Sequence, residues 1–156
     1  MPFIVPQNEL ILLDTCILVH VCRGKKVGRR IMTDQLLKDR SEKPLICVVT
    51  VGEALSLAKQ FNWGAKRQGT LIKLMSELVI ADIYNEEVLN NYAEIDHYLK
   101  KVIKPAHPIG KNDIWIAATA RTADAWLLTS DKHFNPLDSQ FIKRVYIDPD
   151  TGESSR

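Results

Sequence analysis

Two neighbouring segments in the second half of the chain predict a helix and a strand that each present an acid. Asn112 is a favourable helix cap, because its side-chain oxygen can accept a hydrogen bond from a free backbone N–H group. Asp113 then lies in the first turn, where the helix dipole favours negative charge. Three alanines follow and allow the helix over Asn112–Arg121 to lie close against a sheet. The apolar run that begins at Trp126 predicts a strand, and Asp131 stands at its end.

Apolar runs elsewhere in the chain predict further strands, separated by helices. Leu10–Leu13 and Leu45–Val49 are continuous runs, as expected for parallel strands buried on both faces. Shorter runs at Leu78–Ala81 and Ile142–Ile147 predict two more strands. Helical patterns occupy the segments Thr15–Cys22, Ile31–Lys38, Thr50–Phe61, Trp63–Leu78 and Glu86–Val102. This alternation predicts an α/β fold in which helices flank a central, mainly parallel sheet.

Periodicity and length set the expected limits of the core. The helical residues expected to face inward are Ile31, Leu36, Leu37, Val88, Leu89, Tyr92, Ile95, Leu99 and Val102. A chain of 156 residues predicts one domain with a substantial core. We expect residues 1–147 to form this domain and the polar residues 148–156 to form a flexible tail.

Composition places the chain among ordinary globular proteins, with 46% hydrophobic and 26% charged residues. The net charge of +2 is too small to indicate a nucleic-acid partner by itself. Cys16, Cys22 and Cys47 lack the spacing of zinc ligands, so we expect reduced thiols. The sequence shows neither a signal peptide nor an apolar run of the roughly 20 residues that span a membrane, which predicts a cytoplasmic protein.

Two more acids join Asp113 and Asp131 at the expected edge of the sheet. Asp14 ends the first strand, and Glu53 opens the helix after the second. Strand ends and following helix starts share one edge of a parallel sheet, where ligands bind. Four carboxylates brought together repel one another unless a cation neutralises them, and Mg²⁺ or Mn²⁺ prefers oxygen ligands. A site of acids and metal is suited to phosphodiester hydrolysis.

Each acid also has a purely structural interpretation. Asp14 could cap the helix that follows it. Thr50 and Glu53 match the T-x-x-E capping box. Asp113 could be an ordinary first-turn acid, and Asp131 a turn residue.

Four motifs together resemble those of the PIN-domain ribonucleases, and most of all their toxin branch, the VapC-type toxins of type II toxin–antitoxin systems. The motifs are Leu12–Thr15, Thr50–Glu53, Asn112–Ala120 and Leu128–Phe134. The third is the most specific, and the resemblance spans roughly Leu10 to Ile147. It implies a single PIN-like α/β/α sandwich.

The resemblance also implies an activity, a metal and partners. The protein would be a Mg²⁺- or Mn²⁺-dependent endoribonuclease that cleaves tRNA or ribosomal RNA and so inhibits translation. It would be a homodimer held inactive by a cognate antitoxin. Its catalytic and metal-binding acids would be Asp14, Glu53, Asp113 and Asp131, with support from Thr15, Thr129 and Asn112. Cys16 departs from the pattern, because the family commonly has a small polar residue there, which puts the hydrogen bonding of Asp14 in doubt.

Several basic residues are candidates for contacts to RNA phosphates. Lys111, Lys132 and His133 flank two of the acids. A basic segment that we expect to be a loop contains Arg23, Lys25, Lys26, Arg29 and Arg30. Both groups could equally be side chains that are exposed to solvent and bind nothing. Tryptophan can stack on bases, but apolar surroundings favour core packing for Trp63, Trp115 and Trp126.

Three alternatives compete with the ribonuclease. A phosphatase with an aspartyl nucleophile at Asp14 would need an acid two residues later, where Cys16 stands. A receiver-type phosphoacceptor would need a neighbouring acidic pair, which Asp14 lacks. The remaining alternative is a catalytically inert PIN-like module that binds RNA or a protein partner.

Overall fold

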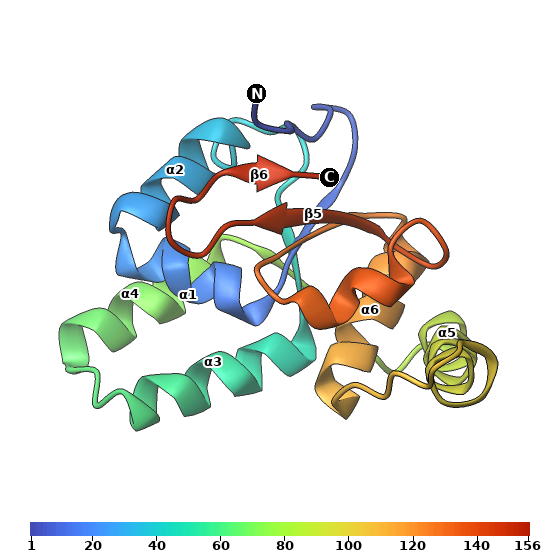
Figure 1. Cartoon of the computed structure of the whole chain (residues 1–156). Helices are drawn as coiled ribbons and strands as arrows, with labels where there is room; N and C mark the ends of the chain where they lie inside the picture. Colours follow the sequence, from blue (N-terminus) through green and yellow to red (C-terminus); the bar gives the residue numbers. More distant parts are fainter.

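A six-stranded sheet in the order β3-β2-β1-β4-β5-β6 forms the centre of the computed structural model, which describes residues 1–156. Figure 1 shows its strands β5 and β6 with helices around them. The strands are β1 (Ile11–Leu13), β2 (Leu45–Cys47), β3 (Val79–Ala81), β4 (Trp126–Thr129), β5 (Lys143–Ile147) and β6 (Ser154–Ser155). All pairings are parallel except that of β5 with β6. The predicted α/β fold with a mainly parallel sheet is therefore confirmed.

Helices cover both faces of this sheet. Their bounds are α1 (Thr15–Arg23), α2 (Lys26–Asp34), α3 (Val48–Gln60), α4 (Ala65–Ser76), α5 (Glu86–His97), the π-helix η1 (Tyr98–Val102), α6 (Lys111–Ala123) and the 3₁₀ helix η2 (Lys132–Leu137). Successive strand residues point to opposite faces. Leu13 therefore packs in one core with α1 to α4, whereas Leu12 packs in the other with α5 and α6.

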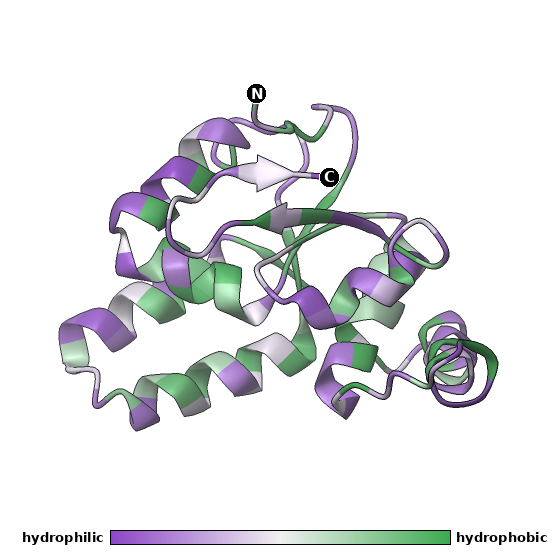
Figure 2. Ribbon diagram, viewed as in Figure 1, coloured by the Kyte–Doolittle hydropathy of each residue, from purple (hydrophilic) through white to green (hydrophobic).

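Both faces of the central strands are buried, as the continuous apolar runs predict. Leu12 and Leu127 are fully buried on one face, and Leu13 and Leu128 are at most 1% exposed on the other. Hydrophilic and hydrophobic stretches alternate along α2 and α4, as expected for helices with one face on a core (Figure 2). None of the helices has the length and apolar character needed to cross a membrane.

The basic segment 23–30 is mostly helical, so its assignment to a loop is wrong. Gly24 ends α1 in the left-handed conformation, with φ of 64°, and α2 begins two residues later. Gly28 lies inside α2 where a Cβ atom would come within 2.0 Å of the His20 carbonyl oxygen. The two glycines thus end one helix and let the next cross it closely, rather than marking a flexible loop.

Several predicted boundaries and inward-facing residues also need correction. Helix α2 ends at Asp34 rather than Lys38, and Leu36, with φ of 51°, is 41% exposed. On the α5–η1 helix, Leu89 and Val102 are likewise exposed, because they flank the buried stripe instead of belonging to it. The remaining residues expected to face inward are buried or half-buried. Strand β2 ends at Cys47, two residues early, because α3 already begins at Val48.

The C-terminal tail is part of the sheet, so the prediction of a flexible tail is wrong. Strand β6 pairs with β5 after a turn at Gly152, which has φ of 76°. Ser154 is 1% exposed, and its hydroxyl donates to the Phe3 carbonyl at 2.7 Å. The Phe3 N–H donates to the Ser154 carbonyl at 3.0 Å, so the two ends of the chain lie side by side (Figure 1).

Candidate active site

Asp14 lies between β1 and α1, where its carboxylate is 4% exposed. Its Oδ1 accepts a hydrogen bond from the Thr15 N–H at 2.8 Å, so it does cap α1. Its Oδ2 also accepts a 2.6 Å bond from the Thr129 hydroxyl, which belongs to β4. Burial raises the pKa of Asp14, and the hydrogen bond from Thr129 opposes part of that rise. The carboxylate therefore caps α1 and, in addition, binds the neighbouring strand β4.

Glu53 is held from two directions on α3. Its Oε1 accepts a 2.7 Å bond from the Thr15 hydroxyl, and its Oε2 accepts a 3.3 Å bond from the Asn112 amide. The Thr15 hydroxyl also lies 3.1 Å from that of Thr50, which is fully buried. The capping-box interpretation of Thr50 and Glu53 is wrong, because Cys47 is the cap of α3.

Asp113 occupies the first turn of α6, as the sequence predicts. The predicted cap at Asn112 is wrong, because the helix begins at Lys111 with Gly110 as its cap. Asn112 is therefore inside the helix and its side chain is available to Glu53. Burial, followed by the negative charges of Asp14, Asp131 and Glu53, raises the pKa of Asp113 to about 7.

Asp131 follows β4 and caps η2, so its interpretation as a turn residue is correct. Its Oδ1 accepts bonds from the His133 N–H at 2.8 Å and lies 2.9 Å from Nδ1 of the same residue. The Asp131 N–H donates to the Thr129 hydroxyl oxygen at 2.9 Å. Thr129 thus joins Asp131 to Asp14 through one oxygen atom.

The four acids come from separate segments and act on one another electrostatically. Asp113 feels the charge of each of the other three, and Asp14 feels that of Asp131. No three His, Cys, Asp or Glu side chains converge closely enough to form a finished metal-ligand cluster. The donor set nonetheless fits a hard divalent cation, since such a cation prefers carboxylate oxygens and would neutralise acids that repel one another.

Cys16 maintains the hydrogen bonding around Asp14. Its Sγ donates to Asp14 Oδ2 at 3.4 Å and accepts from the Ser130 N–H at 3.5 Å. Burial, together with the charge of Asp14, raises the pKa of the Cys16 thiol. The thiol stays protonated and bridges Asp14 to the Ser130 N–H after β4. Cys16 therefore supports the hydrogen bonding of Asp14, although the family commonly has a small polar residue at this position. All three cysteines are free, as predicted.

The predicted basic residues fall into two groups. Lys111 lines a shallow depression with Glu53 and Asp113, and His133 contacts Asp131. Lys132 lies over the Tyr146 ring at 5.7 Å. Segment 23–30 begins at the far end of α1 from Asp14 and is not at the acids.

The tryptophans serve packing, as predicted. Trp63 is 8% exposed, and Trp115 and Trp126 lie against Tyr92 and Phe3 at ring-centroid distances of 4.0 and 5.0 Å.

Two neighbours of the site are absent from the sequence-based prediction. Thr50 fits a capping box in the sequence, so there was no reason to expect its contact with Thr15. His107 lies in the loop before α6, with its ring centroid 6.2 Å from that of His133 and with a buried Nε2 that has no hydrogen-bond partner. No sequence signal distinguishes a loop histidine of this kind.

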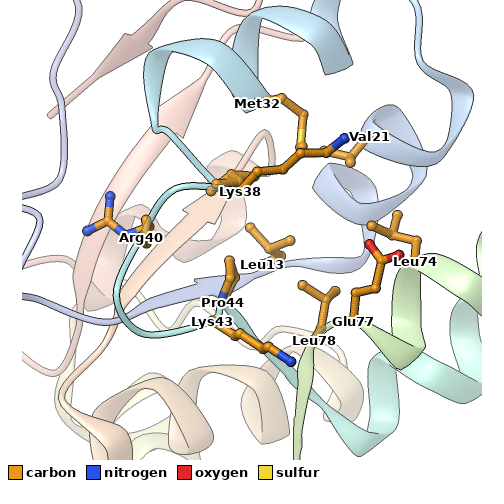
Figure 3. A pocket seen from close by; sticks show the side chains of 11 residues that line it. Leu13, Val21, Met32, Lys38, Arg40, Lys43, Pro44, Leu74, Glu77 and Leu78 are labelled. Carbon is orange, nitrogen blue, oxygen red and sulfur yellow. The ribbon is translucent and has the colours of Figure 1, made fainter.

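An apolar cavity of about 400 Å³ lies away from the acids, between α1, α2 and α4 (Figure 3). Leu13, Leu74 and Leu78 line its apolar part, while Lys38 and Glu77 supply charge. Arg40 also lines the cavity, but its guanidinium turns away and donates to the carbonyls of Pro6 and Glu9 (Figure 3). The cavity lacks the catalytic groups found at the sheet edge.

Comparison with solved structures finds the same fold in chains of toxin–antitoxin complexes. A chain of VapBC2 from Rickettsia felis, solved with a promoter DNA fragment, is 21% identical with a TM-score of 0.66, covering 86% of this chain and 98% of its own. A chain of VapBC-1 from nontypeable Haemophilus influenzae is 24% identical with a TM-score of 0.64, covering 86% and 96%. A chain of the DNA-bound VapBC from Salmonella typhimurium is 17% identical with a TM-score of 0.68, covering 87% and 96%.

At these identities the structural matches support the fold, whereas the family is shown by the sequence match below. No curated protein matches the chain. The family model of the PIN domain matches residues 11–139, which include all four acids and the strands that position them. The chain therefore belongs to the PIN domain family.

Proposed function

We propose that this protein is a Mg²⁺- or Mn²⁺-dependent endoribonuclease and the toxin of a toxin–antitoxin pair. The observation that carries the proposal is the convergence of acids from separate segments: Thr129 joins Asp14 to Asp131, and Glu53 is held by the residues next to Asp14 and Asp113. Burial and the charges of the other three acids also raise the pKa of Asp113 to about 7, as expected for carboxylates that bind a cation in the working protein. Membership of the PIN domain family supports the same chemistry.

Each acid has a proposed role at the metal. Asp14, Glu53 and Asp113 would hold the cation directly or through water, and Asp131 would complete the site or hold a second ion. When bound, the cation supplies an activated water and neutralises charge on the scissile phosphate.

Three polar side chains would orient these acids. Thr129 holds Asp14, whereas Thr15 and Asn112 each hold one oxygen of Glu53. Preorganised carboxylates need less rearrangement when the ion enters.

The RNA would approach the exposed side of the acids. Lys111 and His133 are the proposed contacts to phosphates next to the scissile bond, with Lys132 beside them. The expected substrates are tRNA or ribosomal RNA, and their cleavage would inhibit translation in the cytoplasm. This finer assignment draws on the resemblance to VapC-type toxins and on the VapBC complexes among the structural neighbours.

A cognate antitoxin is the proposed protein partner, and the active form is proposed to be a homodimer. The apolar cavity between α1, α2 and α4, with the exposed Leu36 close by, offers surface that an antitoxin segment would cover. The partner chain is expected from a small open reading frame directly upstream. Copurification of that product with this protein, and loss of cleavage in the complex, would test the pairing.

The central experiment is cleavage of total cellular RNA by the purified protein with Mg²⁺, with Mn²⁺ and with EDTA. Asp113→Asn is the test variant and Asp96→Asn is the matched control, because Asp96 pairs with Lys100 and is not among the acids that act on Asp113. We expect discrete, metal-dependent fragments from the wild type and the control, and none from Asp113→Asn. Equal behaviour of wild type and Asp113→Asn with both metals would favour the inert binding module instead.

A further inference from the structure

The charges of this protein are divided unevenly between its parts. Residues 15–33 and 54–76 contain nine of the 21 Lys and Arg residues and none of the 19 Asp and Glu residues. These segments form α1, most of α2 and α3, and α4, which pack together around one core. In Figure 1 they lie on the side of the molecule away from α5. The small net charge of the chain therefore conceals a strongly basic region.

Most of these positive charges have no carboxylate partner. Among the nine, only Arg30 forms an ion pair, with Asp34 at 3.2 Å. By contrast, Lys143, Arg144 and Arg156 in the C-terminal part are all paired with acids. Unpaired cations on neighbouring helices create a positive potential that attracts a polyanion.

An exposed aromatic ring lies within this basic region. Phe61 is 45% exposed at the end of α3, and the Arg23 guanidinium lies 4.9 Å from its ring centroid. Trp63 is enclosed beneath, with Arg23 and Arg67 over its ring at 6.0 and 5.4 Å. We name Arg23, Phe61, Trp63 and Arg67 the aromatic–basic cluster. The side chains of Lys59 and Lys66 are exposed close to it in sequence.

Helices α1 and α3 connect this cluster to the acids. Thr15 at the start of α1 contacts Glu53 in the second turn of α3 at 2.7 Å, and Arg23 at the end of α1 contacts Phe61 at the end of α3. The two helices thus run side by side in the same direction. Arg23 follows Thr15 by eight residues on α1, and Phe61 follows Glu53 by eight residues on α3. Eight residues correspond to about 12 Å of helix at about 1.5 Å per residue. Roughly four stacked nucleotides at about 3.4 Å each would span that distance.

We propose that the aromatic–basic cluster, with Lys59 and Lys66, is a second binding site for the RNA substrate, which holds an unpaired nucleotide a few positions from the scissile bond. An exposed aromatic ring beside cationic side chains is suited to binding single-stranded nucleic acid, because bases stack on the ring while cations contact phosphates. Arg23 suits both contacts, since its planar guanidinium stacks and donates. This inference rests on the proposed ribonuclease function.

The charge part of the site is tested by Lys59→Glu/Lys66→Glu in the full chain. The probe is a fluorescein-labelled single-stranded RNA of twelve nucleotides and mixed sequence, with binding measured by anisotropy in EDTA. We expect at least tenfold weaker binding and a salt dependence shallower by about 1.4, which is about 0.7 for each lost phosphate contact. The control Lys100→Glu/Lys101→Glu makes the same charge change on η1 and should alter binding less than twofold.

The stacking part is tested by Phe61→Ala and Phe61→Trp. Loss of the ring should weaken RNA binding at least fivefold without changing the salt dependence, whereas tryptophan should preserve binding. Thermal unfolding of each variant checks that the fold is intact. If Phe61→Ala binds RNA as the wild type does, the stacking role is overturned.

Two outcomes would overturn the whole proposal. One is equal RNA binding by Lys59→Glu/Lys66→Glu and its η1 control. The other is that a labelled polyglutamate peptide binds more tightly than RNA and that its binding is lost in Lys59→Glu/Lys66→Glu. That result would make this a surface for an acidic protein.

The binding assay needs neither metal nor cleavage, so it is independent of the proposed function. Loss of RNA binding in the double variant would support the second site even if the wild type cut no RNA. If the wild type cuts RNA and the double variant binds it normally, the second site alone is wrong.

Discussion

The Thr129 hydroxyl donates a 2.6 Å hydrogen bond to Asp14 Oδ2, and the same oxygen accepts a 2.9 Å bond from the Asp131 N–H. One fully buried side chain on β4 therefore links the acid after β1 to the acid after β4. Since β1 and β4 are adjacent and parallel, their ends meet at one edge of the sheet. This link makes the arrangement of the acids testable by substitutions that leave the acids themselves unchanged.

Thr129→Val should damage both stability and cleavage. It removes the shortest hydrogen bond to the buried Asp14 carboxylate, which then retains only the Thr15 N–H and the Cys16 thiol, and it leaves the Asp131 N–H without its partner. We expect this to cost about 1–3 kcal/mol of unfolding free energy. We expect a loss of that size in urea unfolding and at least tenfold slower RNA cleavage.

Thr119→Val is the matched control for this prediction. Thr119 is equally buried, but its hydroxyl donates to the Trp115 carbonyl within its own helix, at 2.8 Å. We expect a smaller stability loss and normal cleavage. Unchanged cleavage by Thr129→Val would show that the link is not needed for the site.

Asp113→Asn should stabilise the metal-free protein at neutral pH. The pKa of Asp113 is raised to about 7 in the folded state and is near 3.8 in the unfolded chain. An acid whose pKa is raised on folding lowers stability as pH rises between these values, and has no effect below both. The stabilisation should be absent near pH 3, grow through this window and level off above pH 7 at about 1–2 kcal/mol, allowing for solvent screening.

Urea unfolding of Asp113→Asn and wild type in EDTA, at several pH values, measures this difference. Asp96→Asn controls for the loss of one charge and should show no comparable pH dependence. A difference between Asp113→Asn and wild type that is constant with pH would mean that Asp113 ionises normally.

Substitutions of Thr15 separate its hydroxyl from its methyl group. Thr15→Val should slow cleavage at least tenfold, because Glu53 loses its 2.7 Å partner and Thr50 loses its neighbour. Thr15→Ser preserves the hydroxyl and should restore most of the rate. The concentration of Mn²⁺ that gives half-maximal cleavage should rise in Thr15→Val and be near normal in Thr15→Ser. Equal rates for the valine and serine variants would rule out the hydroxyl as a support of Glu53.

Gly28→Ala should destabilise the packing of α1 against α2. The added Cβ would lie 2.0 Å from the His20 carbonyl oxygen and 2.7 Å from its carbon, so one helix must move. We expect a loss of about 1–3 kcal/mol in urea unfolding.

Gly69→Ala is the matched control, because nothing lies within 4 Å of its added Cβ inside α4. Helix propensity should make that variant more stable by about 0.5–1 kcal/mol. Equal stability of the two variants would contradict the close crossing of α1 and α2.

The sheet and the location of the acids could be predicted from local sequence. The continuous runs around Leu12 and Leu45 indicate buried parallel strands, and an acid directly after a strand must lie at the carboxyl edge. Such features depend only on residues adjacent in sequence, which is why they could be read without a structure. The role of Asp113 in the first turn of α6 has the same local origin.

Features that depend on contacts distant in sequence could not be predicted. Gly28 looks like a loop residue, because its role depends on how closely α2 approaches His20. The polar tail looks flexible, since its pairing with β5 and with Phe3 uses backbone groups that every sequence has. Asn112 looks like a helix cap until the structure brings it to Glu53, 59 positions away.

The grouping of the basic residues is also a product of the fold. Local composition draws attention to the run from Arg23 to Arg30, whereas the structure brings Arg23 to Phe61 and Arg67 to Trp63. Only the packing of α1 against α3 and α4 turns separate short charge runs into one surface.

The central claim is that acids from four segments form one cation site, and calorimetric titration of Mn²⁺ tests it most directly. We expect the wild type and Asp96→Asn to bind Mn²⁺ alike at pH 8, and Asp14→Asn and Asp113→Asn to bind at least tenfold more weakly while unfolding cooperatively. Because protons compete for Asp113, the wild-type affinity should fall as pH drops below 7. Mn²⁺ binding that Asp14→Asn and Asp113→Asn leave unchanged, or no binding by the wild type, would contradict the claim.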